Sequence, residues 1–459
     1  MKQMPFTLGE IRAAYAKGAR VGDIVREAVR RADAYLDPAV WITRIPSEAL
    51  TARVKELEEL DAATRAAMPL FGMPCAIKDN MDLAGTDTTA GCPAYAYRPA
   101  ETAFAVRRLE AAGAVIIGKT NMDQFATGTA GVRSPYGAPR SVFGRDYVCG
   151  GSSSGSAVAV GAGIVPFALG SDTAGSGRIP AAFNNIVGLK PTRGIISSAG
   201  VVPCNRSIDC VAVLAHSVDD AMEVLDALAA MDPADIYSRD RISLPAAPEG
   251  AFTFAVPRAG DLEFYGDTEN AGMFAAAIAT LERIGGKKVE VDFAPFRDGG
   301  GLLYGAGFIA ERLVDLGEFI EKHEQECHPN VVKLILGNKH RTGVEVFAGM
   351  HKLERFKREA ARVFAGADFL LVPTSPIQAT VAEVLADPIA LPWKFSLYTG
   401  FANILDLAAF AVPAGINARG LPFSVQLVGP MFSEARMAPY ARRFTEALGG
   451  YTGAPPNSH

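Results

Sequence analysis

The pattern of apolar and polar positions divides the chain near residue 68. Before that point, residues 1–67 predict a layer of amphipathic helices, because apolar residues recur at roughly helical spacing, as at Ile11, Tyr15, Val21, Ile24, Val25 and Val29. After it, short apolar runs alternate with helical patterns; the runs are residues 75–77, 114–117, 165–169 and 369–372. This alternation favours a layered α/β fold with the N-terminal helices packed on its core.

Changes in composition indicate further boundaries in the second part of the chain. Residues 245–266 are richer in Pro and Gly, and a new strand is expected to begin near residue 252. We therefore expect one main domain over residues 68–445, with a variable insertion at roughly 240–365. Residues 446–459 are expected to form a flexible tail.

The longest apolar run covers residues 156–170. It is broken by three glycines and a proline and is too short to span a bilayer, so it predicts a buried helix that runs into a strand. The net charge of −5 gives no electrostatic reason to expect a nucleic acid or an anionic membrane as a partner. The six cysteines lack metal-binding spacing and the N-terminus lacks a signal peptide, so we expect reduced core cysteines, no metal site and a cytoplasmic protein.

Two glycine-rich loops that carry serines are the strongest chemical signal. They are residues 150–156, which include Ser152, and residues 172–178, which include Ser176. Glycine is used where the backbone approaches another group or takes a positive φ, so serines held between glycines are expected to face a ligand. An upstream lysine, Lys78, could supply the base that a serine nucleophile needs.

Other patterns in the chain carry less weight. Residues 113–120 fit the phosphate-loop pattern, but the four variable positions are Ala-Val-Ile-Ile, which predict a buried strand instead of a loop. Residues 151–155 fit the nucleophile-elbow pattern, but residues 144–149 before them are a poor strand. The six histidines lie in no recognisable catalytic context, which disfavours a Ser-His-Asp enzyme.

The loops carry a family resemblance. Gly-Gly-Ser-Ser-x-Gly, then Asp-Thr-x-Gly-Ser-x-Arg, with an upstream Lys-Asp-Asn, resemble the amidase signature family of Ser-cisSer-Lys hydrolases over about residues 69–430. Within the family, Ala174, Gly177 and residues 124–128 are similar to the allophanate hydrolases. The resemblance implies an α/β fold with a central mixed β-sheet covered by helices on both faces. The C-terminal domain of longer relatives has no counterpart in this chain, so we expect a catalytic-domain piece or a short family member.

The resemblance also implies a catalytic triad. Ser176 would be the nucleophile, Ser152 would follow a cis peptide bond and pass the proton on, and Lys78 would be the general base. A lysine acts as a base only when neutral, and the apolar residues 73–77 are suited to lowering its pKa by burial. The alternative is that Lys78 only forms an ion pair with Asp79.

Residues around the triad are expected to support it. Four successive backbone amides would form the oxyanion hole, those of Thr173, Ala174, Gly175 and Ser176. Asp172 and Arg178 either clamp this loop or form a simple surface pair. The remaining serines of the first loop are expected to cap the helix that follows; they are Ser153, Ser154 and Ser156.

Substrate recognition is expected from the insertion. Tyr304 and Arg312 are spaced so that one continuous helix would carry both on the same face. In allophanate hydrolases a Tyr and an Arg at this spacing hold the substrate carboxylate, which a guanidinium binds with two parallel hydrogen bonds. Without the resemblance, pairing of Arg312 with Glu311 or another neighbour is the better interpretation. Gly128 and Thr127 lie in a loop that, in relatives, presents backbone groups to the leaving amide.

These features predict an amidohydrolase that cleaves the terminal amide of allophanate, the carboxylated form of urea. It would act through an acyl-enzyme without a cofactor, releasing ammonia and a dicarboxylated product that loses carbon dioxide. The partner would be a small anionic amide, formed by a urea carboxylase or a biuret-cleaving enzyme, and the resemblance suggests a homodimer. The alternatives are a general aliphatic or malonamate-type amidase and a glutaminase-like component of an amidotransferase complex. Because both serine loops and the lysine are intact, a non-enzymatic scaffold is disfavoured.

Overall fold

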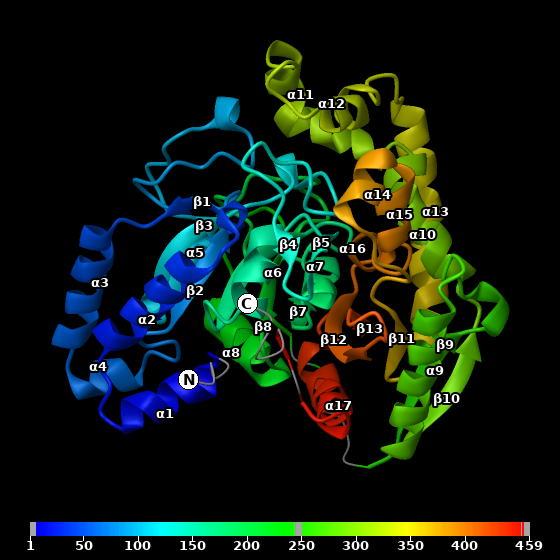
Figure 1. The fold of residues 1–459 in the computed structure, drawn as a ribbon. Helices are drawn as coiled ribbons and strands as arrows, with labels where there is room; N and C mark the ends of the chain where they lie inside the picture. Colours follow the sequence, from blue (N-terminus) through cyan, green and yellow to red (C-terminus); the bar gives the residue numbers. More distant parts are fainter. Residues whose placement is uncertain (1–5, 243, 245–249, 451, 454–459) are drawn as a thin grey trace.

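A mixed sheet of 11 strands runs through the protein (Figure 1). The computed structural model describes residues 6–242, 244, 250–450, 452 and 453. In order across the sheet the strands are β1 (Trp41–Arg44), β3 (Val115–Thr120), β2 (Pro74–Lys78), β6 (Phe167–Asp172), β8 (Cys210–Ala215), β7 (Val187–Lys190), β12 (Ala408–Ile416), β13 (Pro422–Gly429), β11 (Phe369–Pro373), β9 (Phe252–Pro257) and β10 (Gly286–Val291). Parallel pairing joins β3, β2 and β6 and also β11, β9 and β10, and the other neighbours are antiparallel, so the predicted mixed sheet is confirmed.

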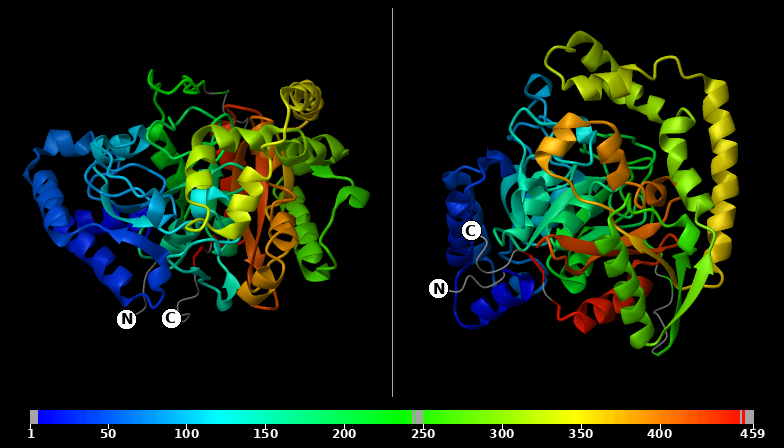
Figure 2. Two further views of the ribbon diagram at one scale, coloured as in Figure 1. Left: turned by 90° about the horizontal axis from the view of Figure 1, so that it is seen from above. Right: turned by 45° about the vertical axis from the view of Figure 1, so that its right-hand side comes forward.

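Helices cover both faces of this sheet (Figures 1 and 2). They are α1 (Leu8–Ala16), α2 (Val21–Ala34), α3 (Ser47–Glu59), α4 (Ala62–Ala66), α5 (Phe104–Ala111), α6 (Ser154–Gly161), α7 (Arg178–Phe183), α8 (Val218–Leu228), α9 (Thr268–Arg283), α10 (Ala294–Gly305), α11 (Arg312–Lys322), α12 (Pro329–Leu336), α13 (Gly343–Phe364), α14 (Val381–Ala386), α15 (Ala390–Phe395), α16 (Phe401–Ile404) and α17 (Glu434–Ala447). Short 3-10 helices are η1 (Pro38–Val40), η2 (Pro93–Tyr95), η3 (Gln124–Ala126), η4 (Ala259–Asp261) and η5 (Phe308–Glu311).

The N-terminal region contains a strand as well as helices. Between α2 and α3 the chain forms β1, which pairs antiparallel with β3 at the edge of the sheet, so the prediction of helices alone was incomplete. Four residues are too few to show the alternation of a strand. The indole of Trp41 lies against Gly118, where a Cβ would come within 2.7 Å of the ring. This close approach accounts for the second glycine of the phosphate-loop-like run, which forms the buried strand β3 as predicted.

Two predictions about the first serine loop had opposite outcomes. The apolar run at residues 156–170 forms α6 and then β6, as predicted, and every residue of α6 is buried. The interpretation of residues 144–149 as a poor strand was wrong, because Gly144–Val148 form β5, which pairs with β4 (Arg140–Ser141) in a separate two-stranded sheet. The partner of β5 comes directly before it in the chain, so a local hairpin forms without the apolar run that a buried strand requires.

The predicted insertion contains both strands and helices. Within it, β9 and β10 extend one edge of the central sheet. Helices α10 and α13 lie side by side, and α11 and α12 lie at the top of the molecule in Figure 1. At the C-terminus, α17 includes the first residues of the predicted tail, while residues 451 and 454–459 lie outside the described part of the chain.

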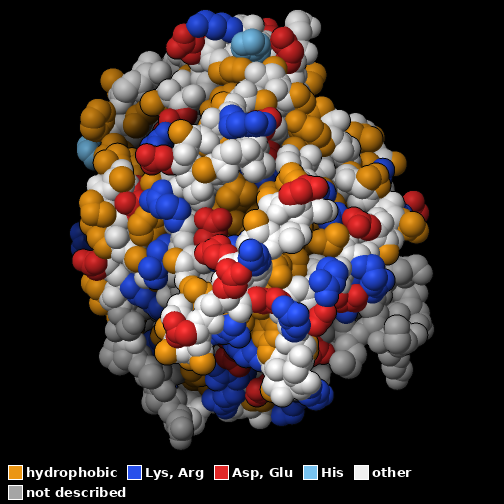
Figure 3. All heavy atoms as spheres, turned by 90° about the vertical axis from the view of Figure 1, so that its left-hand side faces the viewer, with side chains coloured by type: hydrophobic (Ala, Val, Ile, Leu, Met, Phe, Trp, Pro, Cys, Tyr) orange, Lys and Arg blue, Asp and Glu red, His pale blue; other side chains and the backbone are white. Residues whose placement is uncertain are grey.

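Burial and surface charge agree with the composition. All six cysteines are free and buried, which confirms that they are core residues. Across the described ranges, no helix is long and apolar enough to cross a membrane. The same part of the chain holds no cluster of His, Cys, Asp and Glu suited to a metal ion. Figure 3 shows basic and acidic side chains interspersed on the face that carries the N-terminal helices.

Candidate active site

Lys78 is a buried cation surrounded by hydroxyl groups. It is the last residue of β2 and is fully buried, and its Nζ donates to the Oγ of Ser152 at 2.7 Å and to the Oγ of Ser171 at 2.8 Å. Burial lowers the pKa of Lys78 to about 8. The alternative pairing with Asp79 is wrong, because Asp79 forms its ion pair with Lys119, at 3.3 Å.

The loop that presents Ser152 follows the backbone conformation that the resemblance implied. The peptide bond between Gly151 and Ser152 is cis, as expected. Gly150 has a φ of +77°, and a Cβ on Gly151 would lie only 2.1 Å from the Oδ2 of Asp123. Both glycines are therefore required where this loop passes close to its neighbours.

The other serines of this loop do not cap α6, so that prediction was wrong. Ser153 occupies the N-cap position, but its hydroxyl donates to the carbonyl of Ser171 at 3.1 Å and accepts from the amide of the same residue. Ser154 donates to the carbonyl of Asn121, and Ser156 donates to the carbonyl of Leu169. These serines bind α6 to neighbouring strands and loops, which the local sequence does not reveal.

The second serine loop is held by a buried ion pair. The Nε of Arg178 donates to the Oδ2 of Asp172 at 3.0 Å and its Nη2 to the Oδ1 at 3.0 Å, and both side chains are fully buried. Burial alone would raise the pKa of Asp172, but Arg178 outweighs it and the pKa falls to about 2. The interpretation of this pair as a surface contact was wrong.

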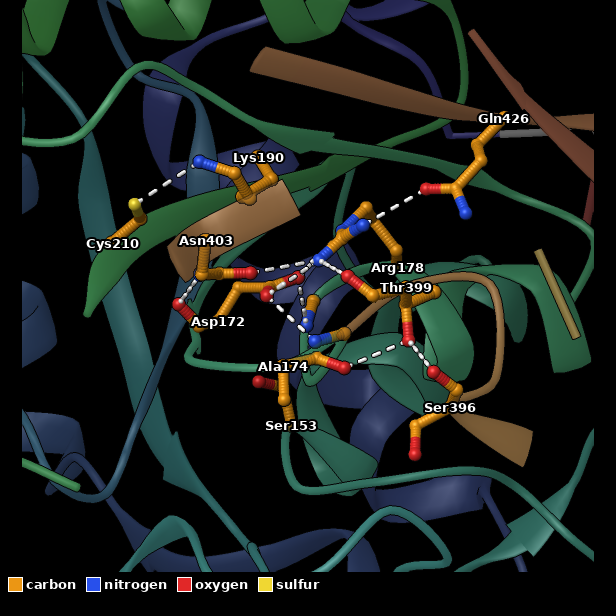
Figure 4. Close-up of polar contacts among 12 residues, drawn as sticks. Ser153, Asp172, Ala174, Arg178, Lys190, Cys210, Ser396, Thr399, Asn403 and Gln426 are labelled. Carbon is orange, nitrogen blue, oxygen red and sulfur yellow. Dashed lines mark hydrogen bonds and ion pairs between the residues drawn. The ribbon is translucent and has the colours of Figure 1, made fainter. Parts of the chain in front are cut away.

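Arg178 also joins this loop to the C-terminal part of the fold (Figure 4). Its Nη1 donates to the Oε1 of Gln426 at 2.9 Å, and its Nη2 donates to the Oδ1 of Asn403 at 2.9 Å and the carbonyl of Thr399 at 3.1 Å. The side-chain Nδ2 of Asn403 in turn donates to the backbone carbonyl of Asp172. The loop conformation therefore depends on β13 and α16 as well as on its own sequence.

The predicted oxyanion-hole amides differ in what they contact. The Gly175 amide donates to the Asp172 Oδ1 at 2.8 Å, so this predicted donor is already engaged. The amides of Thr173, Ala174 and Ser176 have no acceptor among the residues that the structure describes. Three of the four predicted donors therefore remain free to bind a ligand oxygen.

A small cavity of about 40 Å³ brings the second serine loop together with residues of the insertion. Ser176, Thr173 and Ala174 line it, and so do Gly128, Tyr304 and Arg312. Thr127 does not line the cavity; its hydroxyl accepts a hydrogen bond from the Nη1 of Arg312 at 3.1 Å.

The reason for expecting Tyr304 and Arg312 on one helical face was wrong. Helix α10 ends at Gly305, Gly307 takes a φ of +83°, and Arg312 begins α11. The chain turns between the two residues, and the guanidinium still lies 6.0 Å from the centre of the Tyr304 ring. Arg312 does not pair with Glu311, which binds the amide and hydroxyl of Ser207.

Sequence reasoning missed several polar residues of this site. Ser171 lies next to Lys78 and also accepts from the Nδ2 of Asn80, and Asn205 accepts from the Nε of Arg312 at 2.7 Å. Asp209 accepts from the Thr173 hydroxyl at 2.6 Å, and burial raises its pKa to about 6. Ser171 could have been noticed because it precedes Asp172 at the end of an apolar run, but Asn205 and Asp209 carry no local signal.

Known proteins similar to this chain include urea amidolyases, an amidotransferase component and an allophanate hydrolase. The amidase family model matches residues 23–437. Urea amidolyase of Saccharomyces cerevisiae is 40% identical over 412 residues, which are 89% of this chain and 22% of that protein. A glutamyl-tRNA(Gln) amidotransferase component of Geobacillus kaustophilus is 32% identical over 94% of both chains. A solved allophanate hydrolase from Kluyveromyces lactis is 37% identical with a TM-score of 0.89, over 97% of this chain and 72% of that one.

The extent of these matches supports the family but not the whole activity of each relative. The chain spans about a fifth of the length of the urea amidolyases it matches, 22% in both cases. The amidase match, in contrast, covers nearly the whole chain and includes both serine loops and Lys78. The chain therefore belongs to the amidase family and is a hydrolase that acts on amides.

Proposed function

We propose that the protein hydrolyses the terminal amide of allophanate. The observation that carries the proposal is the cavity in which Ser176 and free loop amides lie together with the buried guanidinium of Arg312. The similarity to an allophanate hydrolase and to urea amidolyases supports the same substrate. Allophanate carries an amide at one end and a carboxylate at the other, so it needs both kinds of contact.

Proton transfer begins at Lys78. In its neutral form Lys78 takes a proton from Ser152, which takes one from Ser176, and the Ser176 Oγ attacks the amide carbonyl. The hydrogen bond of 2.7 Å between Lys78 and Ser152 supports this route. With a pKa of about 8, roughly one Lys78 in ten is neutral at pH 7, against about one in 2,500 for a free lysine.

The amides of Thr173, Ala174 and Ser176 then stabilise the oxyanion of the tetrahedral intermediate, and each such donor contributes about 3–4 kcal/mol. Ammonia leaves with a proton returned from Lys78 through Ser152, and the acyl group stays on Ser176. Water attacks the acyl-enzyme in the second step and gives a proton through Ser152 to Lys78. That proton returns by the same route to the Oγ of Ser176 as its bond to the acyl carbon breaks. The released dicarboxylate then loses carbon dioxide in solution.

Recognition of the substrate's acid end is assigned to Arg312 and Tyr304. Arg312 is only 3% exposed, and the hydrogen bonds from its Nε to Asn205 and from its Nη1 to Thr127 fix the orientation of its guanidinium plane. A guanidinium held in this way can bind a carboxylate with little loss of side-chain entropy. Thr127 therefore supports Arg312, and Gly128 in the cavity wall lies next to the leaving amide.

The source of the substrate follows from its chemistry. Allophanate forms when urea is carboxylated or when biuret loses one amide, so we propose that a urea carboxylase or a biuret-cleaving enzyme acts before this protein. The name of the urea amidolyase relatives supports the link to urea.

The test is ammonia release by the isolated chain from allophanate, malonamate and propionamide. We expect allophanate to be the fastest of the three, with malonamate next because it keeps the carboxylate. Faster release from propionamide would indicate a general aliphatic amidase. The similarity to a component of glutamyl-tRNA(Gln) amidotransferase favours a second candidate, a glutaminase-like role in a complex, and activity that required an added partner protein would support it.

A further inference from the structure

A second buried arginine lies in the cavity wall. Arg133 lines the cavity and is 7% exposed. Its Nη1 donates to the carbonyl of Thr127 at 3.0 Å and its Nη2 donates to the carbonyl of Pro388 at 2.7 Å. Both acceptors are neutral backbone carbonyls, so neither of these hydrogen bonds pairs Arg133 with an anion. Its positive charge is therefore buried without a paired anion.

Arg133 and Arg312 are held by the same residue. The guanidinium of Arg312 donates to the hydroxyl of Thr127, and that of Arg133 donates to the carbonyl of Thr127. A guanidinium stays protonated in proteins, so two like charges face one small cavity. The described residues that line the cavity include no Asp or Glu.

The carboxylate of Asp123 acts electrostatically on Arg133, but its hydrogen bond to Arg133 is to the backbone amide and not to the guanidinium. The Oδ1 of Asp123 accepts from the backbone amide of Arg133 at 2.8 Å, and its Oδ2 accepts from the amide of Gly131 at 3.0 Å. A buried cation without a paired anion is costly, and an anionic ligand bound in the cavity would offset that cost. The carboxylate of a ligand in the cavity is suited to supply this pairing.

We propose that Arg133 and Arg312 together form a two-arginine site for the substrate carboxylate, which makes Arg133 a specificity-determining residue for short amides that carry an acid group. This proposal rests on the proposed function and extends it. A carboxylate has two oxygens with about four acceptor positions, so it can receive hydrogen bonds from both guanidiniums at once. Two charges also select more strongly against neutral amides than one charge does.

The test measures binding instead of turnover. In a Ser176→Ala background, isothermal titration calorimetry would compare malonamate, a stable anionic analogue, with the neutral malonamide. Arg133→Met should weaken malonamate binding by at least about tenfold and change malonamide binding by less than about twofold. Arg133→Lys should fall between wild type and Arg133→Met, because an ammonium keeps the charge but not the planar geometry.

A matched control removes a neutral tether between the same two segments. The Thr129 hydroxyl donates to the carbonyl of Pro392 at 2.7 Å, much as Arg133 contacts Pro388. Thr129 also lines the cavity but carries no charge, so Thr129→Val should leave the ratio of malonamate to malonamide affinity unchanged. If Arg133→Met lowers the two affinities equally, as a loosened segment would, the two-arginine site is wrong. If thermal melting shows that Arg133→Met does not fold, the ratio of malonamate to malonamide affinity is measured for Arg133→Lys instead. An unchanged ratio in that variant would reject the two-arginine site.

A double-mutant cycle separates this inference from the proposed function. When Arg133 and Arg312 bind one carboxylate, the loss in the double variant should be clearly smaller than the product of the two single losses. Independent effects would show that the two arginines bind different groups and would overturn the shared site. A loss for Arg312→Met with none for Arg133→Met would reject only the role of Arg133. No loss for either would also count against the proposed function.

Discussion

Two buried cations of the site, Lys78 and Arg312, have similar surroundings and opposite protonation behaviour. Neither forms an ion pair with a described residue, and each is held by neutral side chains. Burial lowers the pKa of Lys78 to about 8. Burial also acts to lower the pKa of Arg312, but neighbouring acidic groups, among them Cys204, Tyr304 and Asp209, outweigh it and the pKa rises.

The difference shows that burial of a cation without a paired anion can produce either a base or an anion-binding group, depending on the side chain. Removing a cation from water without giving it an anion creates a proton acceptor when the cation is a lysine, whose charge is lost at accessible pH. With an arginine the charge cannot be lost, and the same environment favours an anionic ligand. In the proposed site, Lys78 can therefore act at the reactive end because it can lose its charge, and Arg312 can act at the acid-binding end because it cannot.

The largest expected effect would test the reactive end directly. Ser176→Ala should reduce turnover by about a thousandfold or more, because the proposed nucleophile is lost. Thermal unfolding should change little, since Ser176 lines the cavity and is not part of the packed apolar core. Single-turnover measurements of ammonia release would check this. Retention of more than a few per cent of the activity would point to another nucleophile, with Ser153 the first to examine.

The second prediction compares two buried lysines on neighbouring strands. Lys78→Arg keeps the charge but removes the ability to act as a base, so activity should fall by about a hundredfold or more, as for Lys78→Ala. Lys119→Arg is the matched control, because Lys119 contacts the carboxylate of Asp79 and has no proposed chemical role. Steady-state rates and melting curves would be measured for all three. An active Lys78→Arg variant would place the base elsewhere.

The third prediction concerns the acid-binding end. Arg312→Ala should lower kcat/KM for allophanate by about tenfold to a hundredfold, because a charge-assisted hydrogen bond is lost. Hydrolysis of propionamide should stay close to wild type, since that substrate has no carboxylate. Arg312→Lys should recover only part of the loss. Equal losses on both substrates would mean that the change damages the reactive end or the fold.

The smallest expected effect is the pH dependence of the wild-type enzyme. In the proposed mechanism only neutral Lys78 acts as the base, and with a pKa of about 8 its neutral fraction rises from about one in ten at pH 7 to about nine in ten at pH 9. The rate of acylation should therefore rise about tenfold over this range and level off above it. Stopped-flow measurement of the first turnover would show this limb. A flat profile would contradict Lys78 as the base.

The sequence predicted the parts of the site that depend on local pattern. The serine loops, the strand at residues 115–120 and the helix before β6 follow from glycine spacing and apolar runs. Predictions failed where distant contacts decide the outcome. Ser153, Ser154 and Ser156 have the right identity for helix caps, yet acceptors on other segments bind their hydroxyls.

The acid-binding end was harder to predict for a related reason. Helical spacing between Tyr304 and Arg312 is interrupted at Gly305 and Gly307, and the chain turn brings the two side chains together by a different route. Arg133 drew no attention because its neighbours in the sequence carry no motif. Its position becomes informative only when the cavity is known.

The hydrogen bonds of Arg178 also affect when a newly made chain can become active. Its partners Thr399, Asn403 and Gln426 follow it by 221 to 248 residues, so a ribosome completes both serine loops and Lys78 long before these partners leave the exit tunnel. Contacts at such large sequence separation form late, because a long segment must be ordered first. Nascent chains should therefore carry every reactive side chain and still be unable to cleave cellular amides until the C-terminal strands have been synthesised.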